Sequence, residues 1–302
     1  MVPPPVSRRL HVVYLAGTRC GATERTVLLK GSEMAVFSSV LCAVDGSSLA
    51  PRVLRHAIGV AAACGAKLTL LSVSSGDAHP AEAAVAAMLR DVLPRGASYV
   101  GEPRIRAVRV SIGQPVDAIL EFAREGTDLI VAGTHAKSGL SRWLLGSTSA
   151  SLLQQAACPT LLVPPGELEI VTLNADTARF HPGTVLAPVD LAEENPRQLA
   201  LASQLAGLAR QPLVLMTVTA LDMTDEGAEA ALRARAKAIG GPVDRVLVRR
   251  GVVAEAIDHA AIAEHAGLVV MGLGARGHGI AGEIATAVLR TKDAAVLAVP
   301  AV

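Results

Sequence analysis

An apolar run that ends in an aspartate stands at residues 40–45, Val40-Leu41-Cys42-Ala43-Val44-Asp45. A second run of the same kind stands at residues 185–190, Val185-Leu186-Ala187-Pro188-Val189-Asp190. Uninterrupted apolar runs of this length are typical of parallel strands that are buried on both faces. Because the run recurs after a long interval, the sequence indicates that one α/β unit occurs twice.

The surrounding segments repeat in the same order. Each aspartate is followed by a helical pattern, at residues 50–64 and 196–209, and then by another apolar strand, at residues 67–73 and 213–218. Each half later closes with a short strand before a proline. Strands that alternate with helices predict right-handed βαβ units. We therefore expect an α/β fold with two tandem open parallel sheets of about five strands each and helices on both faces.

The two halves differ in length near their second helix. Matching features lie closer together in the second half, which indicates a deletion there, either a shorter second helix or a shorter adjoining loop. The predicted division is an N-terminal extension (1–38), a first domain (39–164), a linker (165–183) and a second domain (184–302). Two readings of the extension stay open: Met34 is the true start and the upstream segment is a mis-assigned or disordered extension, or that segment is a functional tail.

Composition excludes several classes of protein. The chain has 302 residues, of which 51% are hydrophobic and 18% charged, so disorder over most of its length is excluded. A net charge of +1 and 2% aromatic residues argue against a nucleic-acid partner. The longest uncharged run, residues 143–166, contains prolines and polar residues and does not predict a membrane span. We expect a cytoplasmic protein whose four cysteines are reduced.

The candidate binding residues follow the strands of the first half. Asp45 ends the first strand and Val73 the second, while the fourth leads into a loop, residues 133–147, that opens a helix. Ligands of open parallel sheets bind at this carboxyl edge. A carboxylate can accept hydrogen bonds from ribose hydroxyls, and glycines followed by a helix N-terminus favour phosphate. Ser147 and Thr148 add hydroxyl groups at that corner.

The loop carries a resemblance to a known family. Gly133-xx-Ala136, nine residues, then Gly146-Ser147 resembles the G-xx-G-nine-G-[ST] nucleotide signature of the universal stress proteins. The resemblance covers residues 39–164 well and 184–300 more loosely. It implies strand order 3-2-1-4-5 in each half, with the halves paired through their fifth strands as a pseudo-dimer in one chain. A homodimer and unknown protein partners are further expectations.

The resemblance also implies the ligand. It is ATP or a related adenine nucleotide, sometimes with magnesium, and hydrolysis is at most weak. The nucleotide contacts carried over are Asp45, Val73, Gly133, Ala136, Gly146, Ser147 and Thr148. Ala136 departs from the signature, because the family has glycine there. If that position needs a positive φ, alanine weakens binding by about tenfold; if it needs only closeness, one methyl group is tolerated.

Catalytic and metal-ligating residues are not predicted. The sequence has no GxSxG, HExxH or Walker A pattern, and no partner carboxylate that would make His135 a catalytic base is identifiable near it. The leading hypothesis is a stress-response regulatory or sensor protein that binds ATP in its first domain. A nucleotide-free scaffold and a slow ATP hydrolase are the alternatives.

The second half has lost parts of the signature. Gly272-Leu273-Gly274-Ala275-Arg276-Gly277 matches a dinucleotide-binding pattern by letter, but it follows a fourth strand, where that pattern has no role. Aligned with the first half, the two later signature glycines are Ala275 and Ala285. Pro188 removes a ladder donor from the first strand and suggests an irregular strand. We expect a degenerate second site with a mainly structural role.

Overall fold

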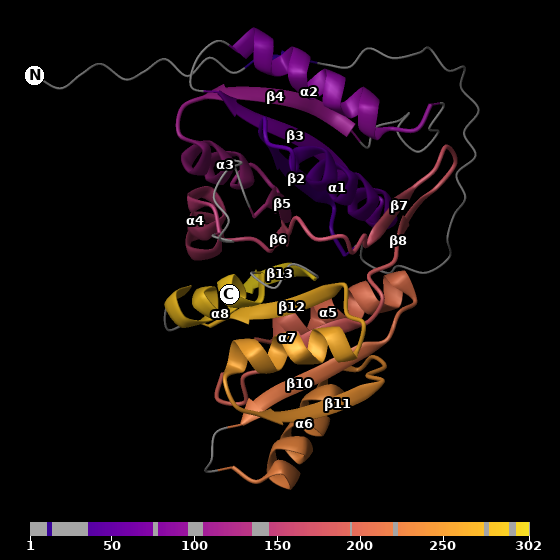
Figure 1. Ribbon diagram of the computed structural model, residues 1–302, viewed down its shortest axis with the longest axis vertical. Coiled ribbons are helices and arrows are strands. Elements are labelled where there is room, and N and C mark those ends of the chain that lie inside the picture. Colours follow the sequence, from indigo (N-terminus) through magenta and orange to yellow (C-terminus); the bar gives the residue numbers. More distant parts are fainter. Residues whose placement is uncertain are drawn as a thin grey trace, which may run out of the picture.

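The computed structural model describes residues 11–13, 36–74, 78–95, 105–134, 145–193, 195–219, 223–274, 278–289 and 294–301. These residues form one 11-stranded sheet with helices on both faces, and a separate two-stranded hairpin (Figure 1). The α/β class predicted from the sequence is therefore confirmed.

The first half contributes five strands and four helices. Its strands are β2 (Ser39–Val44), β3 (Lys67–Ser74), β4 (Ile105–Ile112), β5 (Leu129–Gly133) and β6 (Thr160–Val163). Its helices are α1 (Ala50–Cys64), α2 (Ala78–Val92), α3 (Pro115–Ala123) and α4 (Ser147–Gln155). The bounds of α1 and β6 are those predicted from the sequence.

The second half repeats the series. Its strands are β9 (Val185–Pro188), β10 (Leu213–Thr219), β11 (Arg245–Arg250), β12 (Leu268–Leu273) and β13 (Ala295–Pro300). Its helices are α5 (Pro196–Ala209), α6 (Asp225–Ile239), α7 (Val253–Ala263) and α8 (His278–Leu289). Helices α2 and α6 both have 15 residues. The shorter-helix explanation of the deletion is therefore wrong, and the difference lies in the connection from the second helix to the third strand.

The strands follow the order β1-β4-β3-β2-β5-β6-β13-β12-β9-β10-β11. Within each half this is the order 3-2-1-4-5, and all neighbours within a half are parallel. The fifth strands β6 and β13 pair antiparallel, with Leu161 opposite Leu297. The two sheets expected from the sequence thus join into one, because these fifth strands hydrogen-bond to each other.

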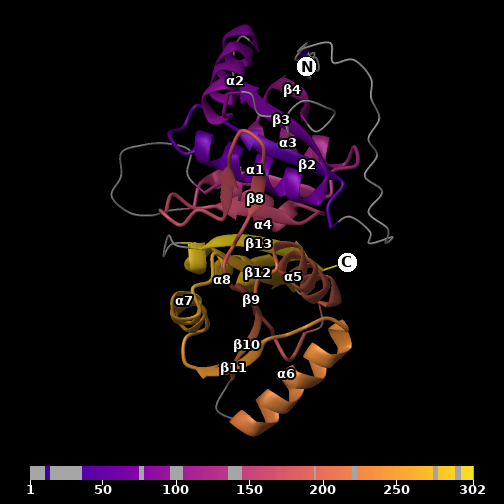
Figure 2. The same ribbon diagram turned by 90° about the vertical axis from the view of Figure 1, so that its right-hand side faces the viewer.

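Four helices cover each face of the sheet. Helices α3, α4, α8 and α7 pack side by side on one face, and α2, α1, α5 and α6 cover the other; Figure 2 shows α7 and α8 opposite α5 and α6 in the second half. Strand residues alternate between the two cores, since Val40 and Cys42 belong to the core under α1 whereas Leu41 belongs to the core under α3 and α4. The continuous apolar strands are explained by this double burial.

The segment between the halves is a structured hairpin. Strands β7 (Val171–Leu173) and β8 (Ala178–Phe180) pair antiparallel and pack on α1 (Figure 1). Gly59 of α1 permits this contact, because a Cβ at that position would overlap the side chain of Val171. The sequence predicted only a linker here, so this covering of α1 is an addition to the expected fold.

The N-terminal extension contributes one described element. Strand β1 (His11–Val13) pairs antiparallel with the edge strand β4, with Val12 opposite Arg109. Residues 36–38 of the extension are also described, with Phe37 buried in the core, whereas residues 1–10 and 14–35 lie outside the described part of the chain.

Candidate functional site

A cavity of about 130 Å³ opens at the carboxyl edge of the sheet in the first half. It lies where β2, β3 and β5 end and where α1, α3 and α4 begin. This edge contains the switch in strand order between β2 and β5, the usual ligand position in open α/β sheets. Its lining consists of Ala43, Val44, Asp45, Ser47, Ala50, Val53, Leu71, Val73, Pro115, Ile119, Ala132, Gly133, Gly146, Thr148 and Ser149.

Among the described residues that line the cavity, Asp45 alone has a charged side chain. Its Oδ1 accepts a hydrogen bond from the backbone N–H of Ser47 at 3.0 Å, which fixes the turn after β2. Aspartate is a favoured helix cap, but Asp45 does not cap α1. The N-cap of α1 is Leu49, without a side-chain cap bond, so Asp45 holds the turn and faces the cavity instead.

The N-terminus of α4 forms the opposite wall. Gly146 is its N-cap and provides no side-chain cap, and the first helical bond runs from the N–H of Ala150 to the carbonyl of Gly146. The N-cap residue therefore offers no side-chain acceptor to the backbone N–H groups of the first turn, and Thr148 and Ser149 of that turn line the cavity. Ser147, which the sequence placed among the contact residues, is exposed and is neither a lining residue nor the cap of α4.

Two hydrogen bonds hold this wall against β5. The N–H of Gly146 donates to the carbonyl of Thr134 at 2.7 Å, and the hydroxyl of Ser149 donates to the carbonyl of Gly133 at 2.6 Å. Gly133 itself lies against α1, because a Cβ there would approach Leu49 Cδ2 to 2.9 Å and Val53 Cγ2 to 3.0 Å. A side chain at position 133 would therefore require the Leu49 and Val53 side chains to shift.

The structure brings Asp45, Val73, Gly133, Gly146 and Thr148 together, as the sequence indicated. Ala136, the departure from the signature, lies outside the described residues, as do His135, Lys137 and Arg142. The contribution of α3, through Pro115 and Ile119, was not foreseen. The sequence signalled a helix opening at Pro115 but not which of its side chains face β2.

The corresponding corner of the second half is built differently. Asp190 repeats the turn of Asp45, with Oδ1 accepting from the N–H of Ala192 at 2.8 Å. Ala285, which aligns with Gly146, is fully buried inside α8 and is not at a helix start. Helix α8 thus runs through the position that corresponds to the start of α4 in the first half. Ala275 lies outside the described residues.

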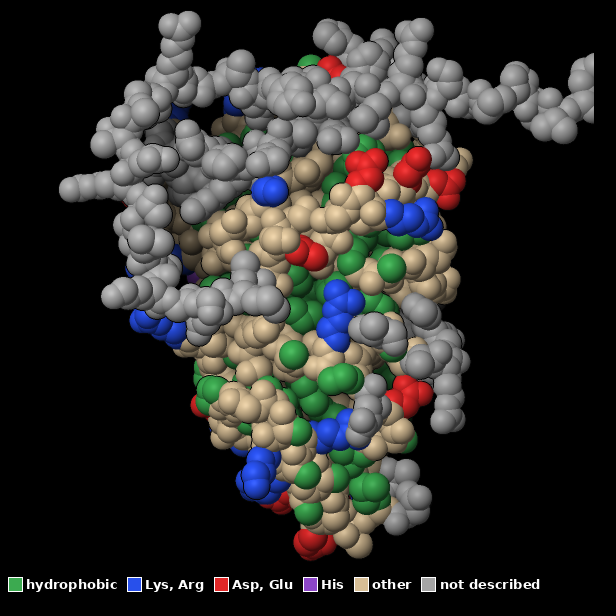
Figure 3. Space-filling view, turned by 180° about the vertical axis from the view of Figure 1, so that it is seen from behind, with side chains coloured by type: hydrophobic (Ala, Val, Ile, Leu, Met, Phe, Trp, Pro, Cys, Tyr) green, Lys and Arg blue, Asp and Glu red, His purple; other side chains and the backbone are tan. Residues whose placement is uncertain are grey.

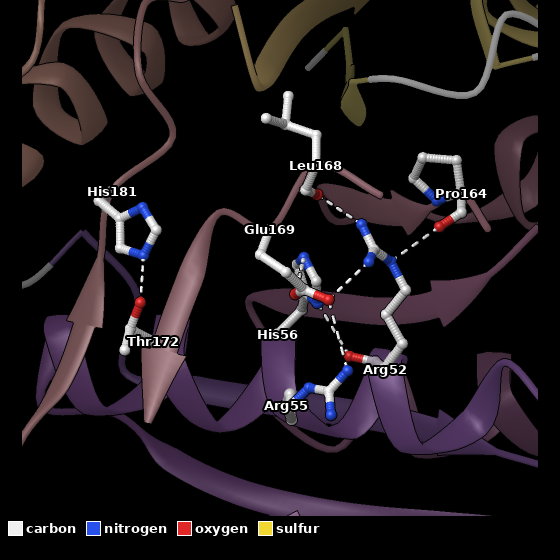
Figure 4. Close-up of polar contacts among 8 residues, drawn as sticks. All are labelled: Arg52, Arg55, His56, Pro164, Leu168, Glu169, Thr172 and His181. Atoms are coloured by element: carbon white, nitrogen blue, oxygen red, sulfur yellow. Dashed lines mark hydrogen bonds and ion pairs between the residues drawn. The ribbon is translucent and has the colours of Figure 1, made fainter. Parts of the chain in front are cut away.

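A polar cluster away from the cavity joins α1 to the segment after β6 (Figure 4). Arg52 donates from Nη1 to Glu169 Oε1 at 2.6 Å, from Nε to the carbonyl of Pro164 at 3.1 Å, and from Nη2 to the carbonyl of Leu168. His56 is 1% exposed, and its Nδ1 donates to the carbonyl of Arg52 at 2.8 Å. Its Nε2 is 3.7 Å from Glu169 Oε2. This arginine–glutamate–histidine cluster fixes the hairpin segment to the first half.

Burial controls the ionisation of His56. Removal from solvent lowers the pKa of His56 to about 4, assisted by the positive charges of Arg52 and Arg55, although Glu169 and the Arg52 carbonyl oppose the shift. The imidazole is therefore neutral at pH 7. A neutral, buried histidine with its Nδ1 proton on a helix carbonyl is a packing residue.

The cysteines in the described part of the chain are free thiols: Cys42, Cys64 and Cys158. Burial raises the pKa of Cys64 and of Cys158 to about 11, and raises that of Cys42 further. Their thiolates, the nucleophilic form, are strongly disfavoured at pH 7. The fourth cysteine, Cys20, lies outside the described residues.

Two features are absent from the described residues. No helix among them is sufficiently long and apolar to cross a membrane. In the same part of the chain, no group of three or more His, Cys, Asp or Glu residues is arranged to hold a metal ion. On the face shown in Figure 3, acidic and basic side chains are interspersed over the coloured surface, as the net charge of +1 leads us to expect.

Comparison with known proteins agrees with this geometry. Residues 37–164 match the model of the universal stress protein family. The universal stress protein YxiE of Bacillus subtilis is 28% identical over 147 residues, which is 42% of this chain and 99% of that protein. A Staphylococcus aureus relative with a universal stress protein name is 31% identical over 148 residues, 45% of this chain and 89% of the relative. The chain belongs to the universal stress protein family.

A solved structure extends the likeness to both halves. A universal stress protein from Archaeoglobus fulgidus superimposes with a TM-score of 0.64 at 20% identity, covering 88% of this chain and 97% of that protein. At this identity the likeness concerns the fold. The universal stress protein fold thus extends beyond the residues that the family model matches.

Proposed function

We propose that this universal stress protein is a stress-response regulatory protein that binds ATP or a related adenine nucleotide in the cavity of the first half. One observation carries the proposal: the start of α4, whose N-cap Gly146 provides no capping side chain, and the carboxylate of Asp45 line one cavity at the switch in strand order. An uncapped helix N-terminus favours anions, and a carboxylate favours hydroxyl donors. The phosphates of a nucleotide are anions, and its ribose hydroxyls are hydrogen-bond donors.

The lining assigns the parts of the ligand. The N–H groups in the first turn of α4, including that of Thr148, would hold the phosphates, and Asp45 would accept from the ribose hydroxyls. The apolar wall of Leu71, Val73 and Ile119 would pack against the base. The phosphates, the ribose and the base would then each contact a protein group that stabilises them.

Magnesium is compatible with this corner only together with a nucleotide. Mg²⁺ is usually bound by one or two carboxylates, substrate phosphates and water. The described lining offers the Asp45 carboxylate and the hydroxyl of Thr148. When bound, the ion would neutralise phosphate charge, and the chain's own part would be to orient the phosphates at the start of α4.

The cavity favours binding over hydrolysis. Among the described residues that line it, no histidine or second carboxylate accompanies Asp45 as a general base. The slow-hydrolase hypothesis therefore gains no support from the lining. The nucleotide-free scaffold remains the rival, and binding measurements separate it from the proposal.

Equilibrium dialysis with ATP tests the proposal directly. We expect the wild type to bind and Gly146→Val to bind at least tenfold more weakly, because a branched side chain at the helix start crowds the phosphate corner. Gly207→Val is the matched control, since Gly207 is exposed on α5 and a Cβ there meets nothing within 4 Å. Negligible binding by a folded wild type would favour the scaffold.

A further inference from the structure

The second half contains a buried amide where the first half has its cavity. Gln198 lies on the first turn of α5, is 4% exposed and points at the carboxyl edge between β9 and β12. Its Nε2 donates to the carbonyl of Pro188 at 2.7 Å and to the carbonyl of Val270 at 2.9 Å. One side chain therefore bridges the two strands at the switch in strand order.

This bridge stands at the place where the strands diverge. The pairing of β9 with β12 comprises Val185 with Leu268 and Leu186 with Val269. Beyond these pairs the two strands part, and the Gln198 amide satisfies both carbonyls that face the gap. The amide oxygen of Gln198 lies against Gly272 of β12. A Cβ added at Gly272 would be only 2.6 Å from this Oε1, so the amide fills the space up to the β12 backbone.

The side chains of Asn195 and Glu193 fill the rest of the carboxyl edge between β9 and β12. Asn195 donates from Nδ2 to the carbonyl of Val299 at 3.2 Å, and the Glu193 carboxylate lies directly against Gly274, where a Cβ would overlap it. Arg235 of α6 anchors the same loop through hydrogen bonds to the carbonyls of Leu191 and Glu193, at 3.3 and 3.2 Å. The chain's own amides and carboxylate thus occupy the edge that is a cavity in the first half.

The sequence identifies the counterpart of Gln198. Helix α1 begins Ala50-Pro51-Arg52-Val53-Leu54 and helix α5 begins Pro196-Arg197-Gln198-Leu199, so Val53 and Gln198 hold the same position. Val53 lines the first-half cavity and has no group that can bridge carbonyls. We propose that Gln198 closes the second site, so that the chain takes up one nucleotide and not two. This proposal deepens the proposed function and rests on it for the identity of the ligand.

Moving the amide to the first half tests the proposal. Val53→Gln places the same side chain over the first cavity, and equilibrium dialysis with ATP should show at least a tenfold loss of affinity. Ala62→Gln is the matched control, because Ala62 is half-buried near the other end of α1 and outside the cavity lining. The wild type and Ala62→Gln should bind one ATP per chain.

A second measurement needs no nucleotide. Gln198→Glu replaces the two donors with a carboxylate facing two carbonyls, so its urea midpoint should fall well below that of the wild type. Gln204→Glu, at an exposed position on α5, should unfold like the wild type. Unchanged unfolding of Gln198→Glu would overturn the bridge itself.

The outcomes separate the two proposals. If the wild type binds no ATP but Gln198→Glu is destabilised, the proposed function fails while the closing bridge stands. If the wild type binds two ATP per chain, or if folded Val53→Gln binds like the wild type, the proposed function stands and the role of Gln198 is overturned.

Discussion

The two halves share strand order and turn geometry, yet their carboxyl edges are opposite in character. In the first half, Val53 leaves a cavity and α4 begins at its rim, whereas in the second half Gln198 fills the edge and α8 runs through the corresponding corner. The scaffold is conserved between the halves down to the aspartate turns at Asp45 and Asp190. A parallel sheet can thus lose a ligand cavity through a few side chains on its first helix, without a change in topology.

Helices α1 and α5 also differ on the faces that point away from the sheet. The hairpin covers α1, and it buries His56 and Gly59. The positions on α5 that correspond to these are Leu201, which is buried, and Gln204, which is exposed. The first half therefore carries an additional layer that the second half lacks, and changes at this layer should affect stability in one half only.

The largest expected effect is acid destabilisation through His56. Its pKa in the folded protein is about 4, below the ordinary value of 6.5, so the unfolded chain binds more protons between these pH values. Stability is fully present above pH 6.5 and falls as the pH drops towards 4, by about 3 kcal/mol in total. Urea unfolding across this range should show a steeper loss for the wild type than for His56→Leu, the residue type that α5 has at this position. Parallel pH profiles would contradict the assignment.

The next effect concerns the contact between α1 and the hairpin. Gly59→Leu forces a side chain into the space of Val171 and should lower the free energy of unfolding by about 2 kcal/mol. Gln204→Leu, at the matching and exposed position of α5, should change it by less than about 0.5 kcal/mol. Equal urea midpoints for the two variants would show that the hairpin does not pack on α1.

The sequence predicted the repeating elements because they depend on local patterns. Continuous apolar strands, the opening prolines of α1 and α5, and the aspartates after the first strands are each visible within a few residues. The order of the strands came from the family resemblance. Five of the seven predicted contact residues line the cavity, since strand ends and helix starts meet at one edge of a parallel sheet.

The missed features depend on contacts between distant residues. Gln198 is an unremarkable polar residue on a helix until the carbonyl of Val270, 72 positions away, defines its role. The hairpin strands β7 and β8 have three residues each and lie in a proline- and glycine-punctuated segment, so their pattern is too short to predict a sheet. Their stability comes from packing on α1, which the local sequence does not reveal.

A smaller effect should separate the two aspartate turns. Asp45→Ala removes the carboxylate that faces the cavity and should weaken ATP binding by about tenfold, or about 1.4 kcal/mol. Asp190→Ala removes the same turn bond in the half that Gln198 closes and should leave ATP affinity unchanged. Equilibrium dialysis of both variants checks this difference, and equal losses would mean that both halves bind ligand.

The smallest effect tests what holds the start of α4 against β5. Ser149 is 3% exposed, and its hydroxyl donates to the carbonyl of Gly133 at 2.6 Å, whereas α8 has Val288 at the matching position. Ser149→Ala should cost about 1 kcal/mol in urea unfolding, because it removes one hydrogen bond and leaves a carbonyl without its donor. Ser151→Ala, half-buried on the same helix, should cost less than about 0.5 kcal/mol. Equal costs would mean that α4 is fixed by its apolar contacts alone, and the corner would then depend on packing in both halves.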